Sequence, residues 1–131
     1  MGRHECAQRA ASRILGVPAQ RLARTHPPDT PLRLLGTTPR QLARMLTAHG
    51  RPSVARTRAA WSELAPGALV CVDLRPLLGG LPRLHWMLVE AVDAARVVVD
   101  GRAVPRAVFE RAWACRCSPF AMHRRALVGR R

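Results

Sequence analysis

Three side chains of the sequence have the types that a cysteine nucleophile requires. Cys6 offers a thiol, His85 an imidazole that can take its proton, and Asp100 a carboxylate that can orient the imidazole. Each has a common structural alternative: a core cysteine, a surface histidine, and an aspartate that precedes Gly101 in a turn. Together, in the order Cys, His and Asp, they indicate nucleophilic catalysis by a thiolate.

Each of these three residues lies at the end of a predicted helix or strand. Small and apolar residues recur at helical spacing over 5–15, which predicts a helix with Cys6 at its start. A helix N-terminus favours a thiolate through its unpaired N–H groups and its dipole. Strands are predicted over 85–92 and 96–101, and the short turn between them predicts an antiparallel hairpin. His85 begins the first strand and Asp100 ends the second, so the two ends should lie side by side.

The remaining patterns predict a single α+β domain. A second helix should begin at Thr38 and Pro39 and end at Gly50, with an apolar stripe of Leu42, Met45, Leu46 and His49. A helical turn is expected over 61–64, a turn at Pro66-Gly67, a strand over 68–74 and a last helix over 104–113. The segment 21–35, which holds three prolines, is expected to be irregular, as is a loop through Pro76, Gly79, Gly80 and Pro82.

The whole chain, residues 1–131, is expected to form this one domain, with a basic and weakly patterned tail from about residue 115. Helices come first and an antiparallel sheet follows, which is the order of an α+β arrangement. Hydrophobic residues make up 48% of the chain, a share that excludes a disordered tail as the main content.

The charge is strongly unbalanced, with 22 basic residues against 8 acidic ones and a formal net charge of +14. One interpretation is an anionic partner such as nucleic acid or a membrane surface, and the other is a solvated Arg-rich surface without a single partner. Aromatic residues make up only 4% of the chain, so stacking platforms for single strands are few.

Cysteine spacing argues against a metal site and against a disulfide scaffold. Four cysteines occur, and Cys115 and Cys117 are too close together for the usual zinc pair. Cys71 lies in an apolar run and is expected to be a core residue. No metal or cofactor is therefore expected. The chain shows no apolar run of membrane-spanning length and no signal-peptide core, so a cytoplasmic protein is expected, with an exported toxin domain as the alternative.

Four stretches of the chain carry a resemblance to a known family. They read ECAQRAASRILG, GTTPRQLARMLTAHG, ALVCVDL followed by LHWMLVEAVDAARVVVDG, and AVFERAW. The sequence resembles the peptidase C39 group, papain-like domains that cleave double-glycine leader peptides from bacteriocin precursors, and its stand-alone relatives. This resemblance implies a papain-like fold, with N-terminal helices packed on a small antiparallel sheet, and Cys6, His85 and Asp100 as the catalytic residues.

The sequence also departs from that family. Its members usually have a Gln about six residues before the cysteine, which supplies one oxyanion donor, and here that position falls at or before Met1. Gln8 lies on the other side of the nucleophile and does not replace it simply. The loss of one such donor typically costs about a hundredfold to a thousandfold in turnover. Ala7 and Gly101 also differ from the residues that the family usually has after its Cys and Asp.

Three alternative functions are considered, with the preferred one first. The first is a cysteine peptidase that acts on a peptide or protein substrate. The second is a papain-fold antibacterial toxin domain that acts on protein or tRNA and is neutralised by an immunity protein, which the small size and the charge of +14 favour. The third is a relative of weak or absent activity that binds a peptide or partner in the former cleft.

Overall fold

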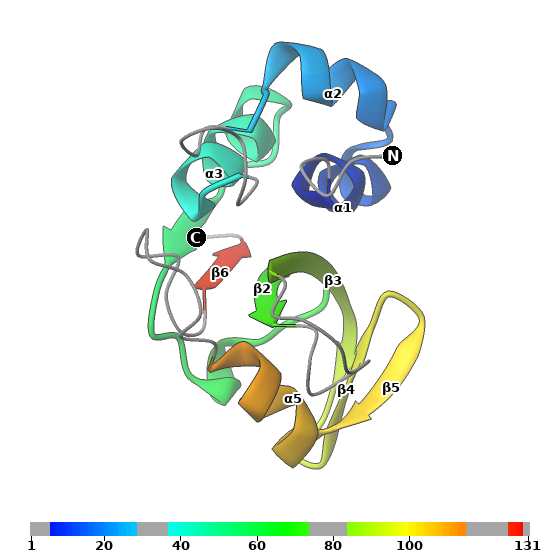
Figure 1. Ribbon diagram of the computed structural model, residues 1–131, viewed down its shortest axis with the longest axis vertical. Helices are drawn as coiled ribbons and strands as arrows, with labels where there is room; N and C mark the ends of the chain where they lie inside the picture. Colours follow the sequence, from blue (N-terminus) through cyan, green and yellow to red (C-terminus); the bar gives the residue numbers. More distant parts are fainter. Residues whose placement is uncertain (1–5, 29–36, 74–83, 115–125, 130–131) are drawn as a thin grey trace.

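The computed structural model describes residues 6–28, 37–73, 84–114 and 126–129. One antiparallel sheet lies between two sets of helices (Figure 1). Helices α1, α2 and α3 lie on one side of it, and helix α5 lies on the other. The protein is therefore an α+β protein, as the sequence predicts.

The bounds of the elements show which residues form each layer. In chain order they are α1 (Cys6–Leu15), α2 (Ala19–Thr25), α3 (Pro39–Ala48), β1 (Val54–Arg56), η3 (Trp61–Glu63), β2 (Leu69–Asp73), β3 (Leu84–Val92), β4 (Arg96–Val99), β5 (Arg102–Pro105), α5 (Arg106–Trp113) and β6 (Ala126–Gly129). The six strands are ordered β1-β6-β2-β3-β4-β5, and every pair of neighbours is antiparallel.

Helix α3 confirms the expected helix start and corrects one residue of its stripe. The hydroxyl of Thr38 accepts a hydrogen bond from the N–H of Gln41 at 3.3 Å, and Pro39 is the first helical residue. Leu42, Met45 and Leu46 are fully buried, as predicted. His49 is instead the exposed residue that caps the C-terminus of the helix, so its assignment to the apolar stripe was wrong.

Helix α2 contradicts the irregular segment expected over 21–35. It follows Pro18 and ends before Pro27, so the prolines bound it rather than break it. Its only buried side chain is Leu22, which is fully buried among residues of α1 and α3. One apolar anchor in seven residues leaves no periodic pattern to detect. Residues 29–36 of the expected segment lie outside the described residues.

The strand expected over 96–101 ends earlier than predicted. Asp100 and Gly101 both have positive φ, 48° and 78°, and form a two-residue turn from β4 into β5. An Asp-Gly pair is a strong hairpin signal, because a turn of this kind needs positive φ at both positions. The last helix consequently begins at Arg106 rather than 104, since Val104 and Pro105 pair with β4 as part of β5.

The expected basic tail contains a strand of the sheet. β6, with all four residues buried, lies between β1 and β2. Its short apolar run, Ala126, Leu127 and Val128, could not be recognised alone because its pairing depends on strands over 50 residues earlier. β1 was also not expected. Residues 115–125 of the tail, and the loop through Pro76, Gly79, Gly80 and Pro82, lie outside the described residues.

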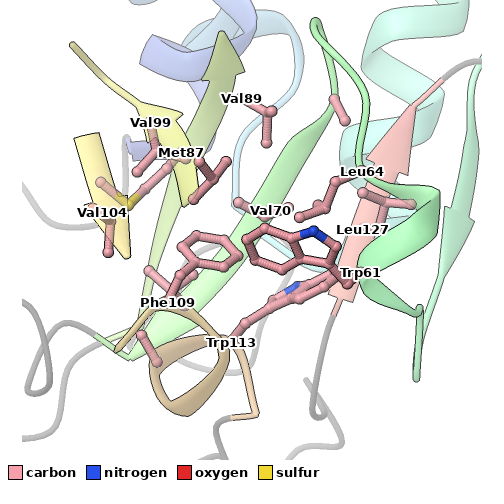
Figure 2. Packing of buried hydrophobic residues seen from close by; sticks show 14 of the residues in the cluster. Trp61, Leu64, Val70, Met87, Val89, Val99, Val104, Phe109, Trp113 and Leu127 are labelled. Atoms are coloured by element: carbon pink, nitrogen blue, oxygen red, sulfur yellow. The ribbon is translucent and has the colours of Figure 1, made fainter. Parts of the chain in front are cut away.

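Each face of the sheet carries its own hydrophobic core. The core beneath α5, called here the α5-side core, is drawn in Figure 2. It gathers the rings of Trp61, Phe109 and Trp113 against valines of the sheet. The core beneath α1, α2 and α3, called here the α1-side core, contains Cys6, Cys71, Trp86, three alanines of α1 and large side chains of α3. Burial of Cys71 confirms its expected core position, and Trp86 is buried in the same core.

Within the described residues, no helix combines the length and apolar character that crossing a membrane would require.

Candidate functional site

Cys6 lies at the position that favours a reactive thiol. It is the first residue of α1 and is 8% exposed, at the edge of the α1-side core. Ala7, Ala10 and Ala11 on the same helix are buried, and α1 packs on β3. Their small side chains let the helix backbone approach the sheet closely, so a side chain as short as cysteine reaches groups on β3.

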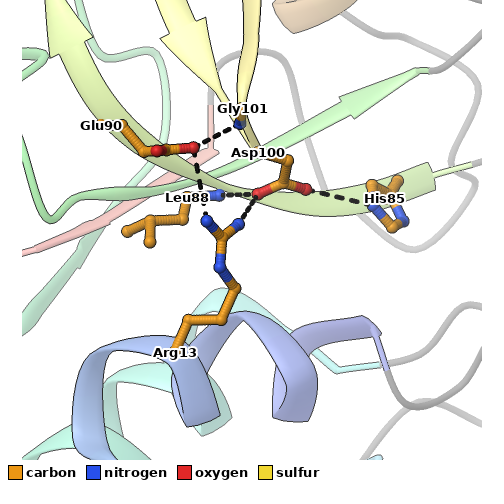
Figure 3. A network of polar contacts seen from close by, with 6 residues as sticks. All are labelled: Arg13, His85, Leu88, Glu90, Asp100 and Gly101. Carbon is orange, nitrogen blue, oxygen red and sulfur yellow. Dashed lines mark hydrogen bonds and ion pairs between the residues drawn. The ribbon is translucent and has the colours of Figure 1, made fainter.

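His85 lies on β3, where it pairs across the sheet with Val72 of β2. Its Nε2 atom is 3.8 Å from Oδ2 of Asp100, a separation that fits an ion pair rather than a direct hydrogen bond (Figure 3). The carboxylate of Asp100 and, after it, the thiol of Cys6 raise the pKa of His85 to about 9, although burial acts in the opposite direction. His85 thus responds electrostatically to both other candidate residues.

Asp100 reaches His85 from the turn between β4 and β5. Its other carboxylate oxygen, Oδ1, accepts hydrogen bonds from the N–H of Leu88 at 3.0 Å and from Nη1 of Arg13 at 2.7 Å (Figure 3). Burial alone would raise the pKa of Asp100. The interaction with His85, the N–H of Leu88 and the charge of Arg13 outweigh it, so the pKa lies below its usual value.

The turn geometry bears on both sequence interpretations of Asp100. An aspartate before glycine indicated either a turn residue or a member of the triad, and here the residue lies in the turn while its carboxylate faces His85. The left-handed backbone at φ 48° belongs to the turn, and the carboxylate faces back toward β3. The structure therefore brings Cys6, His85 and Asp100 together, and their catalytic role stays a prediction.

Two charged residues near the site were not anticipated. Arg13 of α1 contacts Glu90 of β3 through Nη2, at 3.3 Å from Oε1, as well as Asp100. Glu90 also accepts a hydrogen bond from the N–H of Gly101. Glu90 lies at a register shift between Val89 and Ala91. A lone carboxylate within an apolar strand, and an arginine seven residues after the cysteine, were the available signals.

Gln8 is not available as a substitute oxyanion donor. Its side chain is fully buried, and its Nε2 atom donates to the carbonyl of His26 at 2.8 Å and to the hydroxyl of Thr37 at 3.1 Å. An amide nitrogen has two hydrogens, so both are used. Thr37 in turn accepts a hydrogen bond at its carbonyl from the indole of Trp86, at 3.0 Å. Gln8 of α1 is thus linked to Thr37, which precedes α3, and through Thr37 to Trp86 of β3.

The side chains of the site are of the types that take part in acid–base and nucleophilic chemistry. Among the described residues, no group of three or more His, Cys, Asp or Glu side chains could hold a metal ion. A thiol can form a covalent intermediate when an imidazole beside it transfers the protons and a carboxylate orients the imidazole.

In comparisons with protein-family models and with curated proteins, no family model and no curated protein matches the chain.

Proposed function

We propose that the chain is a papain-like cysteine hydrolase that cleaves a peptide bond through Cys6, His85 and Asp100. The observation that carries this proposal is the position of His85. Its Nε2 atom lies 3.8 Å from the carboxylate of Asp100, and the thiol of Cys6 at the start of α1 is close enough to raise the pKa of His85. The resemblance to the C39 peptidases in the same residues adds support.

In the proposed reaction Cys6 attacks the carbonyl carbon of the substrate as a thiolate, whose proton is held by His85. His85, with a pKa of about 9, is mostly protonated at neutral pH and can donate its proton to the leaving amine. The amine leaves and a thioester remains on Cys6. His85 then takes a proton from water as the water attacks the thioester, the carboxylic acid leaves, and Cys6 is again a thiolate beside protonated His85. The backbone N–H of Cys6 would donate one hydrogen bond to the oxyanion.

The test measures the reactivity of Cys6 directly and needs no substrate. The purified chain is treated with iodoacetamide at pH 7, and peptide mapping assigns the label to each cysteine. Cys6 should be labelled rapidly, and the His85→Ala variant should slow this at least about tenfold, since the imidazole no longer stabilises the thiolate. Cys71, which is 4% exposed within the core, is the internal control for global opening.

Two outcomes would contradict the proposal. Labelling of Cys6 at the rate of an ordinary exposed thiol, or labelling that does not change in His85→Ala, would show that the two side chains are not coupled. Once a substrate is found, Cys6→Ala should abolish its hydrolysis while leaving the fold intact. A partner that binds equally well to Cys6→Ala, with no turnover of any substrate, would instead favour a binding domain.

The formal charge of +14 favours a second candidate, a toxin domain of the same fold that acts on RNA. Incubation with total tRNA tests it, with Cys6→Ala as the matched control. Cleavage by the original chain alone would support this candidate, and intact tRNA at high protein concentration would remove it. Protection by a co-expressed acidic neighbour gene product would identify the immunity protein.

A further inference from the structure

Arg13 extends from the same helix that carries Cys6. The two residues are seven positions apart, which is close to two turns of an α-helix, so both project toward the same side of α1. That side packs on β3. Arg13 therefore faces the strand that holds His85, about two helical turns away from the thiol.

The guanidinium of Arg13 joins two carboxylates that come from different parts of the sheet. Nη1 lies 2.7 Å from Oδ1 of Asp100, and Nη2 lies 3.3 Å from Oε1 of Glu90 (Figure 3). Glu90 also accepts from the N–H of Gly101, the residue next to Asp100. Arg13 thus contacts Asp100 directly, and Glu90, which Arg13 also contacts, accepts from the next residue, Gly101. Both residues of the turn are therefore held in place.

The two oxygens of Asp100 have different partners. Oδ1 is held by Arg13 and by the N–H of Leu88, and Oδ2 faces His85. Two donors on one oxygen restrict rotation of the carboxylate, and this restriction leaves the second oxygen directed at the imidazole. The same contact ties the helix of Cys6 to the turn of Asp100.

We propose that Arg13 is a positioning residue of the triad, which orients Asp100 toward His85 and holds α1 where the thiol of Cys6 meets the imidazole. This inference rests on the proposed function. It assigns Arg13 no contact with substrate, because its effect passes through Asp100 and through the placement of α1.

The alternative to a positioning role is that Arg13 forms only a surface ion pair, and the solvent exposure of its side chain is consistent with that alternative. The side chain of Arg13 is 45% exposed, and exposed ion pairs contribute little to stability. A surface pair of this kind would leave the reactivity of Cys6 unchanged after substitution, although loss of the Arg13 charge would still raise the pKa of Asp100. The labelling rate of Cys6 therefore separates the alternatives, and the pKa of Asp100 reports whether the contact with Arg13 exists.

The experiment compares Arg13→Met, Arg13→Lys and the control Arg21→Met, which changes an exposed arginine of α2. Cys6 labelling by iodoacetamide at pH 7 should slow roughly tenfold to a hundredfold in Arg13→Met. Arg13→Lys keeps the positive charge but loses the planar guanidinium that contacts both carboxylates. Its labelling rate should therefore lie between that of the original chain and that of Arg13→Met. Arg21→Met should label at the original rate.

NMR titration of the carboxyl of Asp100 gives a second readout that needs no activity. The charge of Arg13 contributes to the lowered pKa of Asp100, so Arg13→Met should raise this pKa, Arg13→Lys should keep it low, and Arg21→Met should not change it. If Arg13→Met does not fold, Arg13→Lys and Glu90→Gln give the same test, since Glu90→Gln removes the negative charge of the second carboxylate that Arg13 contacts and should slow labelling by a smaller factor.

The failures of the two proposals differ. If Arg13→Met labels at the original rate and the pKa of Asp100 is unchanged, the role of Arg13 is overturned, while slow labelling of His85→Ala would still support the hydrolase. If His85→Ala labels at the original rate, the hydrolase proposal fails first. A rise in the pKa of Asp100 without any change in labelling would also overturn the positioning role.

Discussion

The two cores on opposite faces of the sheet are built from different side chains. The α5-side core contains three aromatic rings, with Phe109 at 6.0 Å from Trp61 and 5.7 Å from Trp113 between ring centroids, and six valines. The α1-side core has Trp86 as its single aromatic ring among the described residues, and it includes three alanines of α1. Two fully buried polar residues, Gln8 and Thr37, also belong to the region of the α1-side core through their bonds to each other and to Trp86.

This difference explains how the helix of Cys6 comes close to the strand of His85. Large rings fill space and stabilise the fold, but they keep backbones apart. Alanines bring the backbone of α1 close to β3, which lets the short side chains of Cys6 and His85 meet. The α5-side core thus serves as the scaffold, and the α1-side core sets the geometry of the site. Four predictions test this division.

The largest effect is expected from Phe109→Ala. Phe109 is fully buried between Trp61 and Trp113, so truncation leaves a cavity and should lower the free energy of unfolding by about 3–5 kcal/mol. Urea unfolding measures this loss, with Arg111→Ala, an exposed change on the same helix, as the control. Under conditions where the variant is folded, Cys6 should label at the original rate. Slower labelling would mean that the two cores are not separate in function.

Ala10→Leu should have a smaller effect on stability and a greater one on the site. Ala10 is 4% exposed, and added carbons there push α1 away from the sheet, at a cost of about 1–3 kcal/mol. Labelling of Cys6 should slow because the thiol moves away from His85. Ala107→Leu, at an exposed position of α5, is the matched control. Unchanged labelling in Ala10→Leu would show that close approach of α1 is not what sets the geometry.

Thr38→Ala should weaken α3, which packs on α1 within the α1-side core. The change removes the hydroxyl that accepts from the N–H of Gln41, and the loss of such a cap typically costs about 1 kcal/mol. Urea unfolding should detect this, whereas Thr57→Ala in an exposed bend should not alter stability. Equal stability of the two variants would argue that α3 is held by packing alone.

The smallest effect is expected from pH. The pKa of His85 is raised to about 9 from an ordinary 6.5, so its contribution to stability is fully present below pH 6.5 and is lost as pH rises to about 9. Asp100 has a lowered pKa, so its contribution is present above pH 3.8 and is lost as pH falls below that value. Stability should therefore peak between these limits.

The expected size of the pH effect is no more than about 1 kcal/mol, because both side chains keep close to a third of their surface exposed to solvent. Urea unfolding at pH 6, 7.5 and 9 measures the alkaline loss, and His85→Gln should remove most of it. A loss of the same size in His85→Gln would assign the effect to other groups.

Local patterns predicted much of the fold correctly. The cap at Thr38, the start of α1 at Cys6, the two strands β2 and β3, and the antiparallel pairing of β3 with β4 all follow from signals within a few residues. The elements that were missed are those whose stability depends on distant partners. β6 is a four-residue strand that needs β1 and β2 on either side, and α2 has one buried anchor.

For the candidate site, the sequence by itself determined the types of the three residues and placed each at the end of an element. It did not determine how Asp100 reaches His85. The register shift at Glu90 and the left-handed turn at Asp100 decided that, and so did Arg13, which meets both carboxylates from another element. These features depend on α1 packing on β3, and contacts between residues about 80 positions apart leave no local pattern in a sequence.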